Sequence, residues 1–233
     1  MRFQHSPAIW ADYPELAAGV LYAEGISDQA SVDRVVDRFT AAAAERLGTG
    51  TESELPEIQA WRRTFARMGL KPTQYRCAAE ALLRRFRKER VLPRIHPLVD
   101  LCNAISLAFA IPVAAFDVKA LAGDLEVRYA TGEEAYQRFD GGTEHPEPGE
   151  VIFADPAGNA HARRWTNRQS GASAVRATTS EVLVVAEAMH DTAAADVSKL
   201  IATAADELAA GWSVNPVTAV LSAASPRFEF GTG

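Results

Sequence analysis

Apolar residues recur with helical spacing through much of the first half of the chain. After Ser31 they lie three or four positions apart, and Gly48 marks the expected end of this helix. Pro56 opens a second segment of the same kind, Thr73 is the expected N-cap of a third, and residues 97–110 form a fourth. The spacing therefore predicts that this half of the chain is mainly helical.

Short runs typical of β-strands replace the helical spacing after Pro112. The sequences VAAFDV, DLEVRYA, EVIFAD, HARRWTN, AVRAT and EVLVVAEAM are separated by Gly, Pro, Asp or Asn and predict an antiparallel sheet, and LAAGVLYA near the N-terminus predicts a buried strand. Because helices and strands are segregated, the expected class is α+β. We expect one domain over residues 1–233, with a helical part at about 28–110, a sheet-rich part at about 111–190 and a C-terminal helix at about 193–210.

The composition permits one substantial core and limits the partners. Of the 233 residues, 48% are hydrophobic and 23% are charged, which is typical of a folded chain. The net charge of −6 argues against non-specific coating of nucleic acid, and no DNA partner is expected. A local basic patch that binds RNA stays compatible with this total.

The two cysteines and the lengths of the apolar runs indicate the cellular compartment of the protein. Cys77 and Cys102 form neither a CxxC pair nor a disulfide framework, as is typical of a reducing cytoplasm. The N-terminal sequence MRFQHSPAIW has no apolar signal core, and the longest apolar run, Ala104–Phe116, is too short to span a bilayer. We therefore expect a cytoplasmic protein that does not associate with membranes.

Several common chemical motifs are missing from the sequence. It contains no GxGxxG after a strand, no GxxxxGK[ST] and no GxSxG. Its five histidines include no HxH or HExxH pair, so no metal site is expected. No organic cofactor is expected either.

Basic residues gather in two places. Seven basic and two acidic residues lie between Arg76 and Arg94, a net charge of +5, which fits either a solvated helix face or a ridge that contacts phosphates. The second cluster, ARRWTNR, consists of Arg163, Arg164, Trp165 and Arg168. Arginine beside an aromatic ring suits a nucleic-acid end on which a base stacks, although an ordinary strand edge has the same pattern. The two clusters together favour RNA.

The stretch from Leu92 to Met189 resembles a known family. Its segments LPRIHPLVDLCNAISL, IPVAAFDVKALAGDLEVRYATGEE and DGGTEHPEPGEVIFADPAG are similar, in order and spacing, to the B3/B4 editing module of the bacterial phenylalanyl-tRNA synthetase β subunit. The flanking AWRRTFARMGLKPTQYRCAAEALLRR and RRWTNRQSG resemble free-standing members of the same superfamily. Those members lack the aminoacylation machinery, for which this chain also has no room, so a ligase is not expected.

The resemblance implies a B3/B4-like fold, rich in antiparallel sheet with helices packed around it, and an editing activity. In the family, water attacks the ester that joins a wrong amino acid to tRNA, with no covalent nucleophile, and a pocket positions the water, the amino group and the terminal adenosine. The implied function is therefore hydrolysis of mischarged aminoacyl-tRNA in trans. The implied partner is the 3′ end of an aminoacyl-tRNA, and the sequence leaves any protein partner open.

The resemblance also implies site residues. The family's TN pair falls on Cys102–Asn103, its histidine in PxHAFD falls on Ala114, and its late acidic residue falls on Glu187. Asn103 and Glu187 are the implied catalytic residues, which would place the reacting groups. The expected substrate-binding residues are Cys102 and Ala114, from the resemblance, with Asp100, from its helical spacing to Asn103, and Trp165, from the arginine-rich cluster.

Helical spacing places Asp100 and Asn103 on one face, and Asp117 ends the following strand. We expect these side chains at the lip of one pocket with Glu187, unless Asp100 and Asp117 cap neighbouring backbone N–H groups. The residues expected to contact tRNA are all arginines: Arg76, Arg84, Arg85, Arg163, Arg164 and Arg168.

Two alternatives stay open at this point. Because the family's threonine and histidine are Cys102 and Ala114 here, the chain is also compatible with a non-catalytic module that binds tRNA or an amino acid. The second alternative is a small-molecule hydrolase or binder that ignores RNA, whose affinity would hardly depend on salt. The family's GxxGG segment is replaced by RRWTNRQSG, so the sequence leaves the amino acid and the tRNA open.

Overall fold

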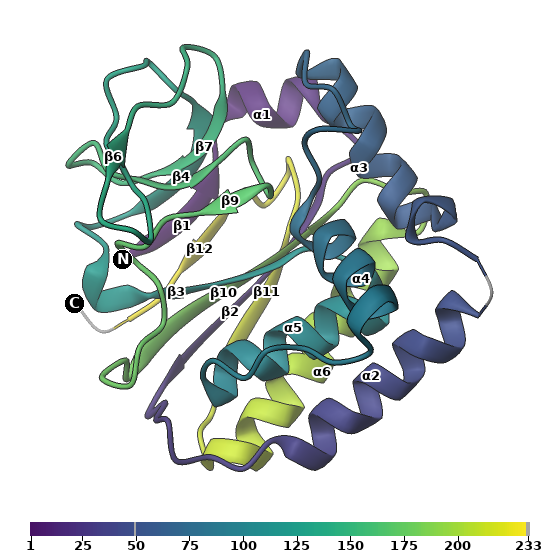
Figure 1. Cartoon of the computed structure of the whole chain (residues 1–233). Coiled ribbons are helices and arrows are strands. Elements are labelled where there is room, and N and C mark those ends of the chain that lie inside the picture. The colour runs from purple at the N-terminus through teal and green to yellow at the C-terminus, as the bar shows by residue number, and fades with distance from the viewer. Residues whose placement is uncertain (49, 232–233) are drawn as a thin grey trace.

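The computed structural model describes residues 1–48 and 50–231 and has three layers (Figure 1). Helices cover one face of a central sheet, and a second sheet covers its other face. The single domain predicted over residues 1–233 also includes Thr49, Thr232 and Gly233, which lie outside the described residues.

The helices follow the apolar spacing of the sequence. Their bounds are α1 (Pro7–Asp12), α2 (Asp33–Leu47), α3 (Pro56–Arg67), α4 (Ala78–Glu89), α5 (Pro97–Phe109) and α6 (Ala193–Trp212), with 3₁₀ turns at Glu52–Glu54 and Val118–Ala120. Helices α1, α3 and α5 begin at a proline, whose missing N–H costs the first turn nothing. Among the described helices, none is both long and apolar enough to cross a bilayer.

Within the described residues, the central sheet has four antiparallel strands in the order β11 (Val217–Leu221), β2 (Ala17–Glu24), β10 (Glu181–Ala188) and β3 (Val113–Asp117). Its side chains alternate between the two faces. Leu21 and Val184 pack in the cluster that includes α2, α5 and α6, whereas Val20 and Val185 face the second sheet. By the same alternation, Glu187 faces the second sheet with Val185.

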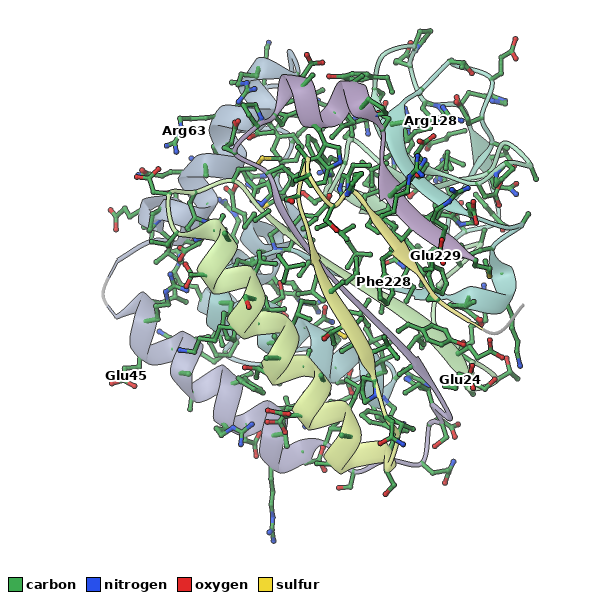
Figure 2. The ribbon with its side chains drawn as sticks, turned by 180° about the vertical axis from the view of Figure 1, so that it is seen from behind. Glu24, Glu45, Arg63, Arg128, Phe228 and Glu229 are labelled. Carbon is green, nitrogen blue, oxygen red and sulfur yellow. The ribbon has the colours of Figure 1, made fainter. Side chains whose placement is uncertain are left out.

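Helix α6 lies tightly against this sheet, beside β2 and β11 (Figure 2). A Cβ atom at Gly19 on β2 would lie only 2.3 Å from the Ile201 side chain, so only glycine fits there. In the same view, Glu45 on α2 and Arg63 on α3 point away from the body of the molecule. The helical layer therefore has one apolar face that packs on the sheet and one charged face that meets solvent.

The second sheet has, in the described part of the chain, six strands in the order β12 (Arg227–Glu229), β1 (Arg2–His5), β4 (Leu125–Tyr129), β7 (Val151–Ala154), β8 (Ala160–Arg163) and β9 (Arg168–Gln169). Strand β1 pairs with β4 in parallel, and the other pairs are antiparallel. Phe3 and His5 on β1 point into the core, while Arg2 and Gln4 are half-buried on the other face. A separate ribbon pairs β5 (Tyr136–Gln137) with β6 (Thr143–Glu144).

The α+β class is confirmed, and the helices predicted after Ser31, from Pro56, over residues 97–110 and near the C-terminus are present. The third helix begins at Ala78 and not after Thr73, because Cys77 caps it by accepting a hydrogen bond from Glu80 N.

The predicted sheet needs three corrections. It is split into two sheets and contains one parallel pair, β1–β4. The AVRAT segment, residues 174–178, is not a strand, and it leads into a turn in which Arg176 and Thr179 bond to each other. The weakly patterned C-terminal tail supplies β11 and β12.

Candidate active site between the two sheets

A cavity of about 60 Å³ lies between the sheets, with room for a few water molecules. Its apolar wall consists of Pro112, Val113, Ala114, Phe153 and Val185, together with Trp165. Its polar lining consists of Thr166, Asn167, Arg168, Gln169 and Glu187. An apolar wall with a few convergent polar groups is typical of a ligand site.

The Glu187 carboxylate is the central polar group of this cavity, and its residue is only 2% exposed. Its Oε1 accepts two hydrogen bonds, from Trp165 Nε1 at 2.9 Å and from His5 Nε2 at 2.6 Å. Among the described residues, no group bonds to its Oε2, and this atom is not among those sealed off from solvent. Two hydrogen bonds therefore hold Oε1, and Oε2 is available in the cavity.

Local structure holds Glu187 in place. Strand β10 carries it between two neighbours, and Trp61 Nε1 on α3 donates to its backbone carbonyl at 3.2 Å. The Trp165 ring lies edge-on to Trp61, with centroids 5.3 Å apart, and to Tyr13, with centroids 4.9 Å apart. These aromatic contacts restrict the orientation of the Trp165 indole, whose Nε1 donates to Glu187.

The turn after β8 directs Trp165 inward. Both Arg164 (φ 48°) and Trp165 (φ 58°) adopt left-handed backbone conformations, which non-glycine residues rarely occupy. Trp165 N donates to Val151 O at 2.7 Å, which anchors the turn. Strain of this kind persists only where surrounding contacts enforce it, and it commonly accompanies ligand sites.

Two further polar atoms at the cavity have no partner among the described residues. They are Thr166 Oγ1 and Asn167 Oδ1, both buried. The amide Nδ2 of Asn167 donates to Arg76 O at 2.7 Å, and this contact fixes the side chain with its oxygen free. Buried polar atoms of folded proteins are normally paired, so these atoms are suited to a bound polar ligand.

The structure does not bring the predicted amide and carboxylate to one cavity. Asn103 is half-buried on α5 and is absent from the residues that line the Glu187 cavity, within the described part of the chain. The amides that line the cavity with Glu187 are those of Asn167 and Gln169, which sequence reasoning missed.

Two other predicted substrate-binding residues on α5 have structural roles. Asp100 accepts a hydrogen bond from Ile95 N at 2.9 Å and thus holds the segment before the helix. Cys102 packs in the helix-side core, and burial raises the pKa of its thiol to about 12, so it stays protonated. Asp117 is likewise a cap, as its side chain accepts from Lys119 N and from Thr179 Oγ1.

Ala114 and Trp165 line the cavity, and their binding of a substrate stays a prediction. The position of the family's histidine is therefore an apolar wall here. The imidazole at this site belongs to His5, which sequence reasoning also missed. The alternation of RFQH was the available signal, because it places His5 on the same face as the apolar Phe3.

The predicted tRNA contacts divide into three groups. Arg163 is a correction: it is buried and bonds to Glu150 and Glu144, so it cannot reach a phosphate without breaking both contacts. Arg168 lines the cavity and pairs with Glu144 at 3.2 Å, and Arg164 lies over the Tyr75 ring.

The remaining three arginines lie on or next to α4. Arg76 donates to Thr73 O at 2.7 Å. Arg84 and Arg85 have exposed side chains, which lie 3.9 Å from Glu52 and 2.8 Å from Glu89, respectively. Because surface ion pairs of this kind are weak, both arginines stay available to a polyanion.

A second buried carboxylate, Asp155, follows β7 in the second sheet. His161 Nε2 lies 3.1 Å from Asp155 Oδ2, and His161 Nδ1 lies 2.9 Å from Ser173 Oγ. Burial alone would raise the pKa of Asp155, but hydrogen bonds from Asn159, His161 and Ala122 N lower it to about 2. His161 and Ser173 are fully buried, so no substrate can reach this Ser–His–Asp arrangement in the folded chain.

A profile of the family described as the B3/4 domain matches residues 60–210, which is more than half of the chain. The chain belongs to the B3/4 domain family. This B3/4 domain is 36% identical over 63 residues to the phenylalanine–tRNA ligase β subunit of Shewanella oneidensis, a match that covers 27% of this chain and only 8% of that protein. The resemblance predicted from the sequence is thus confirmed at the level of the domain.

One solved structure also aligns with the B3/4 domain. It is an N-terminal fragment of the phenylalanyl-tRNA synthetase β-subunit from Pyrococcus horikoshii, and the alignment covers 92% of this chain and 49% of that one. The TM-score is 0.47 and the sequence identity is 8%.

Proposed function

We propose that this B3/4 domain binds the 3′ end of aminoacyl-tRNA and hydrolyses the ester of a misattached amino acid in trans. The observation that carries the proposal is the Glu187 carboxylate, which has one oxygen held by His5 and Trp165 and the other free in a cavity. Family membership supports the choice of tRNA, since related domains belong to a tRNA ligase subunit.

In the proposed reaction, Glu187 Oε2 orients a water molecule and accepts its proton. The water oxygen bonds to the ester carbonyl carbon, and the bond from that carbon to the ribose oxygen breaks. The proton passes from Glu187 to the leaving ribose oxygen, which gives a free amino acid and a tRNA with its hydroxyl restored. Positioning and general-base assistance supply the rate, with no covalent intermediate.

The neighbouring polar atoms have a matching role. Thr166 Oγ1 can donate to the carbonyl oxygen, where negative charge develops during attack. Asn167 Oδ1 can accept from the substrate ammonium.

The arginines near the cavity supply the proposed contacts to RNA. Arg168 lines the cavity, Arg164 follows β8 in the same turn as Trp165, and Arg84 and Arg85 are exposed on α4, whose first residue also lines the cavity. Such a surface would bind the phosphates near the tRNA end and would orient the ester towards Glu187.

A second candidate function is binding without hydrolysis. The observation in its favour is that the apolar Ala114 occupies the place of the family's histidine, and Asn103 does not reach the cavity. In this case the free oxygen of Glu187 would accept a hydrogen bond from the ammonium of the amino acid and would orient no water.

A panel of tRNAs, each carrying one radiolabelled amino acid, distinguishes the two candidates. Release of label from one charged tRNA, at a rate proportional to protein concentration, supports hydrolysis. Saturable binding with no release supports the binding module, and neither binding nor release across the panel contradicts both.

The salt dependence of binding tests the RNA surface separately. Charge reversal of Arg84 and Arg85 together should weaken tRNA binding and reduce the slope of log K against log salt by about 1–2. The matched control is charge reversal of Arg63, which points to solvent from α3. Binding that is independent of salt would instead indicate a small-molecule site.

A further inference from the structure

Three metal-ligating side chains meet away from the Glu187 cavity. They are Glu57 in the first turn of α3, His190 just after β10, and Asp196 in the first turn of α6. Each offers one ligand atom, and these atoms all lie within 4.8 Å of one another. The cluster therefore joins three segments that are far apart in the sequence.

Two buried atoms of this cluster lack a partner among the described residues, Glu57 Oε2 and His190 Nδ1. Both residues are only 6% exposed, so bulk water does not satisfy these atoms. An unpaired carboxylate oxygen and an unpaired imidazole nitrogen in one buried cluster are both costly, so a ligand that bonds to these side chains would relieve that cost.

The surrounding contacts orient these side chains as outer-shell partners do at metal sites. Arg46 on α2 bonds to Glu57 Oε1 and leaves Oε2 free. Thr192 Oγ1 donates to Asp196 Oδ2 at 2.6 Å, and His190 Nε2 lies 2.9 Å from the same oxygen. The N-terminal ends of α3 and α6 stabilise the two carboxylates.

We propose that Glu57, His190 and Asp196 form a binding site for a divalent transition-metal ion, with zinc as the best fit. One imidazole and two carboxylates suit zinc, which commonly takes three protein ligands and leaves a fourth position open. The Asp196 side chain is 38% exposed, so the ion reaches the site from solvent and keeps a bound water there.

The local charge is compatible with a dication. The two carboxylates outweigh the Arg46 guanidinium, and a neutral imidazole adds no charge. Arg46 nevertheless repels a cation and limits the affinity, so binding at micromolar metal concentration is expected. Because the ion bridges α3, the segment after β10 and α6, its binding should stabilise the folded chain.

Calorimetric titration of the metal-stripped, untagged full chain with zinc chloride tests the proposal. One ion per chain is the expected result, together with a rise in the melting temperature. The substitution Asp196→Asn, at a half-exposed position that tolerates change, should abolish this binding, and His190→Ala should do the same. Thr192→Ala, which removes an orienting contact, should weaken binding by about tenfold.

Two exposed residues provide matched controls. His145→Ala and Asp191→Asn each remove an exposed group of the same chemical type, and both should bind zinc like the unmodified chain. The proposal is overturned if zinc does not bind at micromolar concentration, or if Asp196→Asn and His190→Ala bind it unchanged. Preference for magnesium over zinc in parallel titrations would also overturn it.

Discussion

The second sheet and its neighbours contain two buried carboxylates, each bonded to a buried histidine, and their surroundings differ. Both oxygens of Asp155 accept hydrogen bonds, from the backbone and side chain of Asn159, from two other backbone N–H groups and from His161. In the part of the chain that the structure describes, only one oxygen of Glu187 accepts any, from His5 and Trp165.

This difference separates a structural carboxylate from an available one. A carboxylate can accept about four hydrogen bonds, and groups of the protein itself already occupy all the acceptor sites of Asp155. Within the described residues, Glu187 keeps an unused oxygen at a cavity where two buried atoms of lining residues, Thr166 Oγ1 and Asn167 Oδ1, are also unpaired. A histidine next to a buried acid is therefore no sign of catalysis by itself, and the count of unused acceptor sites is the better indicator.

The largest expected effect is on turnover in Glu187→Gln. The amide keeps the shape and can still accept from Trp165, but it cannot take a proton from water, so deacylation should fall on the order of 10²–10³-fold. Stability should change by less than about 1 kcal/mol. Single-turnover release of labelled amino acid measures the effect, with the exposed Glu45→Gln as control; activity equal to that of the control would refute the role of Glu187.

Asp155→Ala should lower stability and leave deacylation unchanged, which is the opposite of what Glu187→Gln should do. It leaves His161, Asn159 and several backbone N–H groups without an acceptor in a buried place, so unfolding free energy should fall by about 3 kcal/mol. Urea denaturation followed by circular dichroism measures this loss. Deacylation per folded molecule should be retained, and a protein of normal stability would show that these bonds contribute little.

His5→Ala should have a smaller effect on turnover than Glu187→Gln. Loss of the imidazole leaves Glu187 Oε1 held by Trp165 alone, so kcat should fall by about tenfold while KM hardly changes. Gln in place of His5 puts a donor near the same point and should restore part of kcat. If KM rises and kcat stays constant, His5 acts in binding and not in positioning the carboxylate.

The smallest expected effect is on the pH dependence of stability, and it should be confined to the pH range in which Asp155 titrates. Asp155 has a folded pKa of about 2 against an ordinary value of 3.8, because its hydrogen bonds outweigh the effect of burial. Its stabilising contribution is therefore complete above about pH 4 and is lost as the pH falls towards 2. Asp155→Asn should flatten the stability curve in this window, as measured by thermal melts; an unchanged curve would assign the acid sensitivity to other groups.

Much of the fold was predictable because it depends on local pattern. The helices from Pro56 and from Pro97 carry apolar residues at helical spacing, and β10 is a long apolar run that only a doubly covered strand can bury. Strand β1 was missed because four residues give too short a pattern, although it supplies His5.

The site was harder to predict, because its residues meet only through tertiary packing. A linear resemblance placed Glu187 and Ala114 at the cavity, but it could not separate Asn103 on α5 from Asn167, which a turn brings beside Glu187. Charge patterns also could not reveal that Arg163 is buried between two glutamates.

His5 and Glu187 are 182 positions apart, and their contact completes the site. At ordinary translation rates, His5 leaves the ribosome on the order of ten seconds or more before Glu187 is synthesised. A growing polypeptide therefore cannot form this contact until Glu187 has been added, and the His5 side waits for its partner through most of synthesis.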